Sequence, residues 1–310
     1  MSRVYAIGES LLDIFFRDGE VFASRPGGSM LNTSVSLGRL GMPVYMLTEY
    51  AMDQVGHVIE NFLKDNGVGL DHICRFEEGK TALALAFLDE GGEASYDFYK
   101  HYPGQRLKIS LPDFKAGDIV LFGSFYALLP EIRSHIIPIL KKAKARGALV
   151  IYDPNIRSPH RKEIDQLRVA ILENISMADI VRGSDEDFNN IFNINNPHDA
   201  FGEVQRSGCQ CLIYTMNKSG VHLISKKQNQ FYKVPEIQTI STVGAGDSFN
   251  AGVIYTLWTK KLESKDIQVL PLQTWNEIIE TGIQFASIVC KSLDNYIPVD
   301  FASKMRGLAE

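Results

Sequence analysis

The chain has 310 residues, of which 45% are hydrophobic and 22% charged, a composition typical of a soluble globular protein with one large α/β domain or two smaller ones. Its formal net charge of -5 gives no electrostatic reason to expect nucleic acid or an anionic membrane as a partner. No apolar run approaches the roughly 20 residues of a membrane-spanning helix, and the N-terminal segment MSRVYAIGES reaches glycine and glutamate too early for a signal peptide.

The N-terminal part of the chain predicts alternating strands and helices. Short apolar runs at residues 4–8 and 44–48 are typical of strands. Between them, SMLNTSVSLGRLG carries apolar residues at helical spacing and stops on Gly41, a suitable helix C-cap. The segment QVGHVIENFLKDNG then repeats the helical pattern.

The next segment departs from this rhythm. Residues 81–88 and 94–100 alternate in polarity on either side of Gly91 and Gly92, which predicts a hairpin. GESLLDIFFRDGEVFA, near the N-terminus, predicts a shorter hairpin. Together they predict a small β-strand lid, with strands within about residues 12–26 and 81–104.

From residue 118 the strand–helix alternation resumes. The runs DIVLFG, ALVIYD, ADIVRG and CLIYT are typical of strands, and helical segments lie near residues 131–146, 161–174 and 185–206. This order predicts an α/β fold, with a mostly parallel sheet flanked by helices on both faces and ligands bound beyond the carboxyl ends of the strands. No linker divides the chain, so we expect one domain over residues 1–310.

The cysteines do not indicate a metal site. Cys209 and Cys211 form a C-x-C, but no second Cys or His pair follows at zinc-ligand spacing. We therefore expect Cys74, Cys209, Cys211 and Cys290 to be buried, reduced thiols, which suits a cytoplasmic protein.

The stretch TVGAGDSFNAG at residues 242–252 sets an acid behind two glycines at the start of a helical pattern. Gly244 and Gly246 allow close backbone approach, and the helix N-terminus would stabilise an anion. Asp247, in the first turn, could then accept a proton from a hydroxyl that attacks a bound phosphate. Alternatively, Asp247 complements the helix dipole and the glycines tighten a loop. The stretch matches neither the P-loop nor the dinucleotide-binding pattern.

This stretch resembles the D-T-x-G-A-G-D signature of the PfkB (ribokinase-like) carbohydrate kinases. That family also carries an N-terminal glycine pair followed by Asn, which GGSMLN at residues 27–32 matches. Both signatures occur in the family's order, and the resemblance runs from the first strand to the C-terminal helix. It implies a ribokinase-like fold and an ATP-dependent sugar kinase, most similar to fructokinases. The alternatives are a 2-keto-3-deoxygluconate kinase, another sugar or nucleoside kinase, or a non-catalytic sugar sensor.

The resemblance also assigns residues to the phosphoryl-transfer and sugar sites. Asp247 matches the catalytic base, and Gly244, Ala245 and Gly246 match the anion hole. The residues that match sugar contacts are Asp13, Gly27, Gly28 and Asn32, with Tyr99 and Lys100 on the lid. YDPNIR resembles a D-x-N-x-R segment of fructokinases and 2-keto-3-deoxygluconate kinases, in which Arg157 could clamp phosphate or substrate. A sugar acid would need cationic or polar groups, for which Lys100, Arg106 and Arg157 are available.

For the nucleotide, the resemblance points to two further segments. VRGSDEDF replaces the family's N-x-x-E and offers Ser184 beside the nucleotide and Asp187 in an indirect role toward Mg²⁺, with Glu186 as a rival. Alternatively, these three residues are simply the polar start of a helix. YTMNKSG resembles T-x-G-x-x-G, with Thr215 and Gly220 matched and Asn217 in place of a glycine. The cofactors implied are ATP and Mg²⁺.

The chain differs from the family at two places that bind a monovalent cation in relatives. Ser241 replaces the first Asp of the signature, and KSLDNYIP lacks the Gly-Ala of the later loop. In relatives these groups hold an activating monovalent cation, so we expect weak or absent K⁺ activation. Because the lid hairpins expose strand edges, we expect a homodimer that pairs through the lid.

Overall fold

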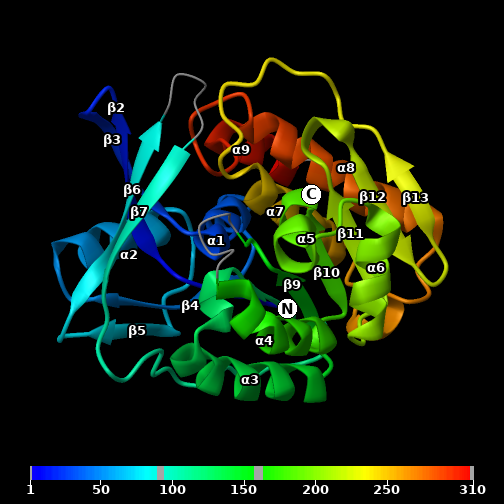
Figure 1. Ribbon diagram of the computed structural model, residues 1–310, viewed down its shortest axis with the longest axis horizontal. Helices are drawn as coiled ribbons and strands as arrows, with labels where there is room; N and C mark the ends of the chain where they lie inside the picture. Colours follow the sequence, from blue (N-terminus) through cyan, green and yellow to red (C-terminus); the bar gives the residue numbers. More distant parts are fainter. Residues whose placement is uncertain (1, 89–93, 157–162, 308–310) are drawn as a thin grey trace.

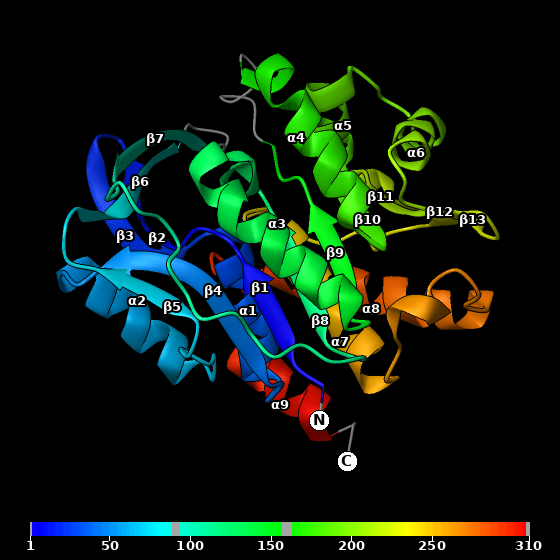
Figure 2. The ribbon, with the colours of Figure 1, turned by 90° about the horizontal axis from the view of Figure 1, so that it is seen from below.

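The strand–helix alternation builds one large twisted sheet at the centre of the protein (Figures 1 and 2). The computed structural model describes residues 2–88, 94–156 and 163–307. The strand order is β13-β12-β11-β10-β9-β8-β1-β4-β5. All pairs from β5 to β11 are parallel, and β12 and β13 are antiparallel additions at one edge. The strands are β1 (Val4–Ile7), β4 (Val44–Ala51), β5 (Ile73–Phe76), β8 (Ile119–Gly123), β9 (Leu149–Asp153), β10 (Ile180–Ser184), β11 (Cys211–Thr215), β12 (Val221–Ser225) and β13 (Asn229–Tyr232).

Helices cover both faces of this sheet, as Figure 2 shows. Alternate side chains of each strand point to opposite faces, so that Val4 and Ala6 join one hydrophobic core and Tyr5 and Ile7 the other. The helices of the first core are α1 (Ser29–Arg39), α2 (Gln54–Asp65), α7 (Ala245–Thr259), α8 (Leu272–Val289) and α9 (Val299–Gly307). Those of the second are α3 (Pro130–Ala145), α4 (Ile164–Met177), α5 (Asp185–Phe192) and α6 (Pro197–Arg206). No described helix is long and apolar enough to cross a membrane.

A second, four-stranded sheet projects to one side of the carboxyl edge of the large sheet (Figure 1). Its order is β3-β2-β6-β7, with an antiparallel hairpin at each side and β2 and β6 parallel in the middle. The strands are β2 (Leu11–Arg17), β3 (Glu20–Gly27), β6 (Lys80–Leu88) and β7 (Ala94–His101). We refer to this sheet as the lid.

The lid is fastened to the large sheet by a polar anchor at the start of β6. Asp53 caps α2 by accepting from the amide of Gly56 at 2.8 Å. The same carboxylate accepts from the amide of Thr81 at 3.0 Å and from its hydroxyl at 2.7 Å. One side chain therefore fixes the end of the lid to the helix that follows β4.

The expected α/β class, with a mostly parallel sheet and a small lid, is confirmed. Two features differ from the predictions. The helical segment near residues 185–206 is two helices, because Asn193 adopts φ 56° and Pro197 then starts α6. The antiparallel strands β12 and β13 and the short strand β5 had no predicted counterpart. Short 3-10 helices lie at Phe125–Leu128, Asn217–Ser219 and Ser264–Asp266.

Candidate active site

A pocket of about 110 Å³ lies between the lid and the N-termini of α1 and α7. It collects polar groups from segments that are far apart in the sequence, as expected at the carboxyl edge of a parallel sheet. The lining residues are Glu9, Leu11, Asp13, Gly28, Ser29, Asn32, Tyr96, Phe98, Lys100, Ser124, Phe125, Tyr126, Asn155, Val243, Asp247 and Asn295.

Asp247 lies in the first turn of α7, where α1 holds its carboxylate. The hydroxyl of Ser29 donates to Oδ1 at 2.6 Å, and Nδ2 of Asn32 donates to Oδ2 at 2.9 Å. Asn155, at the end of β9, donates in turn to the hydroxyl of Ser29 at 2.9 Å. Asp247 is only 5% exposed. Neutral donors therefore fix the carboxylate in a defined direction at the wall of the pocket.

The turn before α7 requires glycine at its N-cap. Gly244 adopts φ 78°, in the left-handed region that favours glycine. A Cβ added there would also collide with the backbone of Asn295, which belongs to the loop that follows α8. The first amides of α7 have no partner within the helix, although that of Ala245 donates to the carbonyl of Thr242 at 3.2 Å, and the helix dipole adds positive potential at the same point. The turn is thus built to receive an anion.

A buried arginine lies directly behind this turn. Nη1 of Arg182 is 3.0 Å from Oδ2 of Asp153, and Nη2 donates to Oγ1 of Thr215 at 2.9 Å. Asn250 donates to the same Asp153 oxygen at 2.5 Å. A Cβ on Gly246 would lie 2.9 Å from Nη1, so the missing side chain lets the guanidinium pack against the turn. Burial raises the pKa of Asp153 to about 6, whereas the Arg182 charge acts to lower it.

The two glycines before α1 have separate steric reasons. An added Cβ on Gly27 would collide with the carboxylate of Asp13, which therefore lies flat against the backbone. Gly28 has φ 117°, and its Cβ would collide with the carbonyl of Glu9. The glycine pair thus sets the wall of the pocket between β1, β2 and α1.

Some polar atoms at this wall have no partner among the described residues. Oδ1 of Asn32 is one, and both side-chain polar atoms of Asn295 are two more; both residues are buried. Buried polar atoms are rarely left unsatisfied in folded proteins. Atoms of this kind beside a pocket indicate a polar ligand with several hydroxyl groups.

The lid contributes the opposite wall. Tyr96, Phe98 and Lys100 on β7 line the pocket, as the two-residue period of a strand requires. Tyr99, one of the expected sugar contacts, is instead 60% exposed and does not line the pocket. Nζ of Lys100 is 2.8 Å from Oε2 of Glu9.

Arg106 does not reach the pocket wall as a free cation. Its Nε donates to Oε1 of Glu49 at 2.5 Å, and its guanidinium lies 3.5 Å from the centre of the Tyr102 ring. Both charged residues are buried. Arg106 is therefore committed to a structural ion pair, and Arg157 lies outside the described residues.

The residues expected beside a nucleotide lie at the same sheet edge but outside this pocket. Ser184 and Thr215 are register partners at the ends of β10 and β11. Asn217 adopts φ 47° and Gly220 φ 131°, so the loop after β11 uses the left-handed conformation at both positions. This edge is continuous with the turn before α7, because Arg182 bridges it.

Asp187 has the structural role that the sequence also allowed, at the polar start of a helix. Its Oδ2 accepts from the amide and the hydroxyl of Ser184, both at 2.7 Å, and its Oδ1 accepts from the amide of Ile156 at 2.6 Å. The bond from the Ser184 amide, together with the bond from the Asp187 amide to the Ser184 hydroxyl at 3.1 Å, forms the capping box of α5. Among the described residues, no group of three or more His, Cys, Asp or Glu side chains could hold a metal ion.

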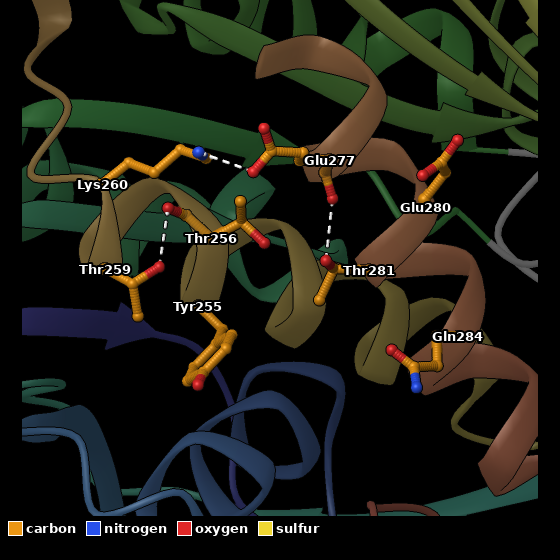
Figure 3. A pocket seen from close by; sticks show the side chains of 8 residues that line it. All are labelled: Tyr255, Thr256, Thr259, Lys260, Glu277, Glu280, Thr281 and Gln284. Atoms are coloured by element: carbon orange, nitrogen blue, oxygen red, sulfur yellow. Dashed lines mark hydrogen bonds and ion pairs between the residues drawn. The ribbon is translucent and has the colours of Figure 1, made fainter. Parts of the chain in front are cut away.

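A larger open hollow of about 650 Å³ lies between the C-terminal half of α7 and α8 (Figure 3). Lys260 and Glu277 form an ion pair of 2.6 Å across it. Lys260 follows Asp247 by thirteen positions, which places it about 20 Å away along the helix. This hollow is separate from the convergent polar groups around Asp247, so we assign the active site to the smaller pocket.

A glycine turn at a helix N-terminus, a fixed carboxylate and a pocket under the lid are a suitable arrangement for phosphoryl transfer to a small molecule on a parallel α/β sheet. The family comparison gives the particular class: residues 1–300 match the model of the pfkB family carbohydrate kinases. The chain belongs to this family and is an ATP-dependent sugar kinase.

Curated relatives carry fructokinase names. "Probable fructokinase-6, chloroplastic" of Arabidopsis thaliana is 29% identical over 268 residues, which cover 82% of this chain and 70% of that protein. The fructokinase of Rhizobium leguminosarum bv. trifolii is 29% identical over 269 residues, covering 84% and 82%.

Solved structures share the fold. The aminoimidazole riboside kinase of Salmonella enterica, complexed with aminoimidazole riboside and an ATP analogue, superposes with a TM-score of 0.84 at 20% identity, covering all of both chains. A double-mutant fructokinase of Vibrio cholerae O395, with fructose, ADP and a potassium ion bound, gives 0.83 at 21% identity and covers 96% of this chain and 95% of that one.

The structure brings together Asp13, Gly28, Asn32, Lys100 and Asp247 around one pocket. Sequence reasoning missed other members of the site. Arg182 was detectable as a charge within an otherwise apolar strand run, and Glu9 as an acid at a strand end. Ser29 and Asn295 gave no signal, because only the tertiary fold brings them to Asp247 and Gly244.

Proposed function

We propose that this chain is a fructokinase, which transfers the γ-phosphate of ATP to a primary hydroxyl of fructose. The observation that carries the proposal is the carboxylate of Asp247, held by Ser29 and Asn32 in the pocket wall at the N-terminus of α7. The fructokinase names of the curated relatives support this sugar.

In the proposed reaction Asp247 takes the proton of the attacking hydroxyl. The hydroxyl oxygen forms a bond to the γ-phosphorus as the bond to the bridging oxygen of ADP breaks, so ADP leaves with that electron pair. The amides at Gly244, Ala245 and Gly246 stabilise the charge that develops on the phosphoryl oxygens. Arg182, packed behind Gly246, adds positive potential at the same place.

We further propose that ATP lies along the edge formed by Ser184, Thr215, Asn217 and Gly220. Mg²⁺ would supply charge neutralisation of the phosphates when bound with ATP. Asp187 is proposed to act on this site indirectly, by holding Ser184 and the backbone at Ile156 in place. On the sugar side we propose Asp13, Gly27, Gly28, Asn32 and Lys100 as contacts.

The proposal extends to assembly and location. We propose that both sheets act as one catalytic domain, that two chains pair through their lids, and that the protein works in the cytoplasm. Large apolar side chains exposed on the lid strands and absent from the pocket lining support the pairing: Val21, Phe22, Phe87 and Tyr99. Light scattering on the wild type and on Phe22→Lys tests it, since a monomeric wild type contradicts lid pairing.

The test of the function is coupled ADP release with Mg·ATP. Fructose, tagatose, ribose, 2-keto-3-deoxygluconate and adenosine are compared as acceptors in the wild type and in Asp247→Asn. We expect fructose to be preferred and the variant to lose about 10²–10⁴-fold in kcat. Asp185→Asn, which changes an acid in the first turn of α5, is the matched control and should retain activity.

The outcomes separate the alternatives. Preference for another acceptor moves the assignment to a 2-keto-3-deoxygluconate kinase or another sugar or nucleoside kinase. Binding of sugar without any ADP release would make the protein a sensor. An Asp247→Asn variant as active as the wild type would remove Asp247 from the chemistry.

A further inference from the structure

We propose that Glu9 makes this pocket selective for neutral sugars, because its carboxylate neutralises Lys100 and denies an anionic substrate that partner. The inference rests on the proposed sugar site and names the class of substrate that it takes. Glu9 acts here as a specificity-determining residue, and Lys100 is the cation that it controls.

The geometry ties both oxygens of Glu9 to the end of the lid. Nζ of Lys100 lies 2.8 Å from Oε2, and the hydroxyl of Tyr102 donates to Oε1 at 2.5 Å. Glu9 itself lies in the short link between β1 and β2. Its side chain is 13% exposed and that of Lys100 27%, although Lys100 as a whole residue is exposed. The shielding of the pair therefore comes mainly from the side of the Glu9 carboxylate.

A chain of contacts fixes this arrangement from behind. The Tyr102 ring, whose hydroxyl reaches Glu9, stacks under the guanidinium of Arg106 at 3.5 Å. Arg106 is anchored by Glu49, which also accepts from the amide of Leu107 at 2.6 Å. Glu9 is therefore oriented by a buried framework, and a ligand that recruited Lys100 would have to break its ion pair with Glu9.

The charges of the residues that line the pocket also favour a neutral substrate. Among its described lining residues are three carboxylates, Glu9, Asp13 and Asp247, and one ammonium group, that of Lys100. The pocket therefore has an excess of negative charge, which repels a sugar acid and still offers acceptors to sugar hydroxyls. The unpartnered atoms of Asn32 and Asn295 suit hydroxyls equally well.

The test compares a sugar acid with a neutral sugar on the same enzyme. The ratio of kcat/KM for 2-keto-3-deoxygluconate over fructose is measured in the wild type, Glu9→Gln and Glu9→Gln/Lys100→Met. Glutamine can still accept from Tyr102 but leaves the Lys100 charge uncompensated. We expect the ratio to rise about tenfold in Glu9→Gln, mainly through KM, because a charged hydrogen bond becomes available to the carboxylate. The added Lys100→Met change should return the ratio to the wild-type value.

Two further variants isolate the effect. Glu131→Gln removes an acid that contacts Arg106 at 3.4 Å outside the pocket, and its ratio should equal that of the wild type. Arg157→Gln shows whether this arginine supplies a competing cation. A wild-type ratio well above one that falls in Arg157→Gln would overturn the inference, since a sugar acid would then have its own partner.

The results for Glu9→Gln and for the double variant decide whether Glu9 has this role. A ratio that stays constant in Glu9→Gln, or a rise that survives Lys100→Met, refutes the role of Glu9. Binding of the two sugars, measured by calorimetry, gives the same ratio if turnover is absent, so failure of the kinase proposal leaves this inference testable. If another neutral sugar replaces fructose as substrate, the fructokinase assignment fails and the ratio is taken against that sugar. Melting temperatures near that of the wild type confirm that each variant is folded.

Discussion

Replacing Arg182 with methionine should destabilise the protein by breaking a buried charge pair. Its guanidinium bonds Asp153 and Thr215, and the Asp153 side chain is completely buried. Methionine fills much of the same volume but carries no charge. The variant therefore leaves a carboxylate in the interior with only the amide of Asn250 as a described neutral donor.

The expected loss of stability in Arg182→Met follows from the isolation of the Asp153 carboxylate. Removing one partner of a buried ion pair costs about 3–5 kcal/mol, because the remaining charge is desolvated without compensation. A domain has about 5–15 kcal/mol of stability in total, so the loss is large. For a chain of this length it corresponds to a fall in Tm of roughly 5–15 °C.

The pH dependence provides a signature of the cause. Burial already raises the pKa of Asp153 from 3.8 to about 6 in the presence of Arg182, and without the guanidinium this pKa rises further. A carboxyl whose pKa is raised by folding binds its proton more tightly in the folded state. Its favourable contribution is present below the unfolded pKa and is lost as the pH rises through the folded pKa. The deficit of the variant should therefore be smallest near about pH 5 and grow toward about pH 8.

Urea unfolding across this pH range measures the effect, with Arg182→Met/Asp153→Asn as the matched control. The double variant has no buried charge to strand, so it should regain most of the stability and lose the pH dependence. Its kcat should stay low, since the positive charge behind Gly246 is still missing. A single variant as stable as the wild type at about pH 8, or a double variant no better than the single one, would refute this reasoning.

Three further results are expected. Gly244→Ala should cost about 1–3 kcal/mol in urea unfolding and lower kcat, because alanine is strained at φ 78° and collides with Asn295; wild-type stability would contradict this. Asp53→Ala should lower the free energy of unfolding by about 1–2 kcal/mol near neutral pH, because it removes the cap of α2. Although burial opposes ionisation of Asp53, hydrogen bonds including those from Thr81 lower the pKa of its carboxyl. That contribution is present above the unfolded pKa and is lost as the pH falls through the lowered folded-state pKa, so equal losses at about pH 7 and about pH 3 would contradict it. Rates of ADP release in K⁺ and tetramethylammonium salts should agree within about twofold, because Ser241 replaces the carboxylate expected to hold a monovalent cation. Strong stimulation by K⁺ would show that another group holds the ion.

Local sequence patterns were sufficient for the large sheet. The run CLIYT coincides with β11, and the runs for β8, β9 and β10 agree with the observed strands to within one or two residues. Each of these runs is apolar because parallel strands are buried on both faces. The edge strand β13 is half-exposed and largely polar, and β12 is an inner antiparallel strand whose apolar residues are interrupted by His222, so neither strand was predicted.

The residues of the site also differ in how far local sequence could predict them. Gly27, Gly28 and Gly244 could be identified from sequence because a close backbone approach or a positive φ leaves glycine as the suitable residue. The orientation of Tyr99 could not, since it depends on the register of β7 against β6. The sequence offered Arg106 as a possible substrate contact because of its charge. Its ion-pair partner Glu49 lies more than fifty positions earlier, so the sequence could not show that this charge is already paired.

The order of the segments along the chain has an evolutionary consequence. The lid and the wall that faces the sugar come from residues 8–32 and 80–101, whereas the turn before α7 and its helix come from residues 244–259. Changes in the lid strands can alter which acceptor is admitted while leaving the second part intact. A lineage of such enzymes can therefore diversify its substrates by drift in the lid, as long as Ser29 and Asn32, which hold the carboxylate of Asp247, are retained.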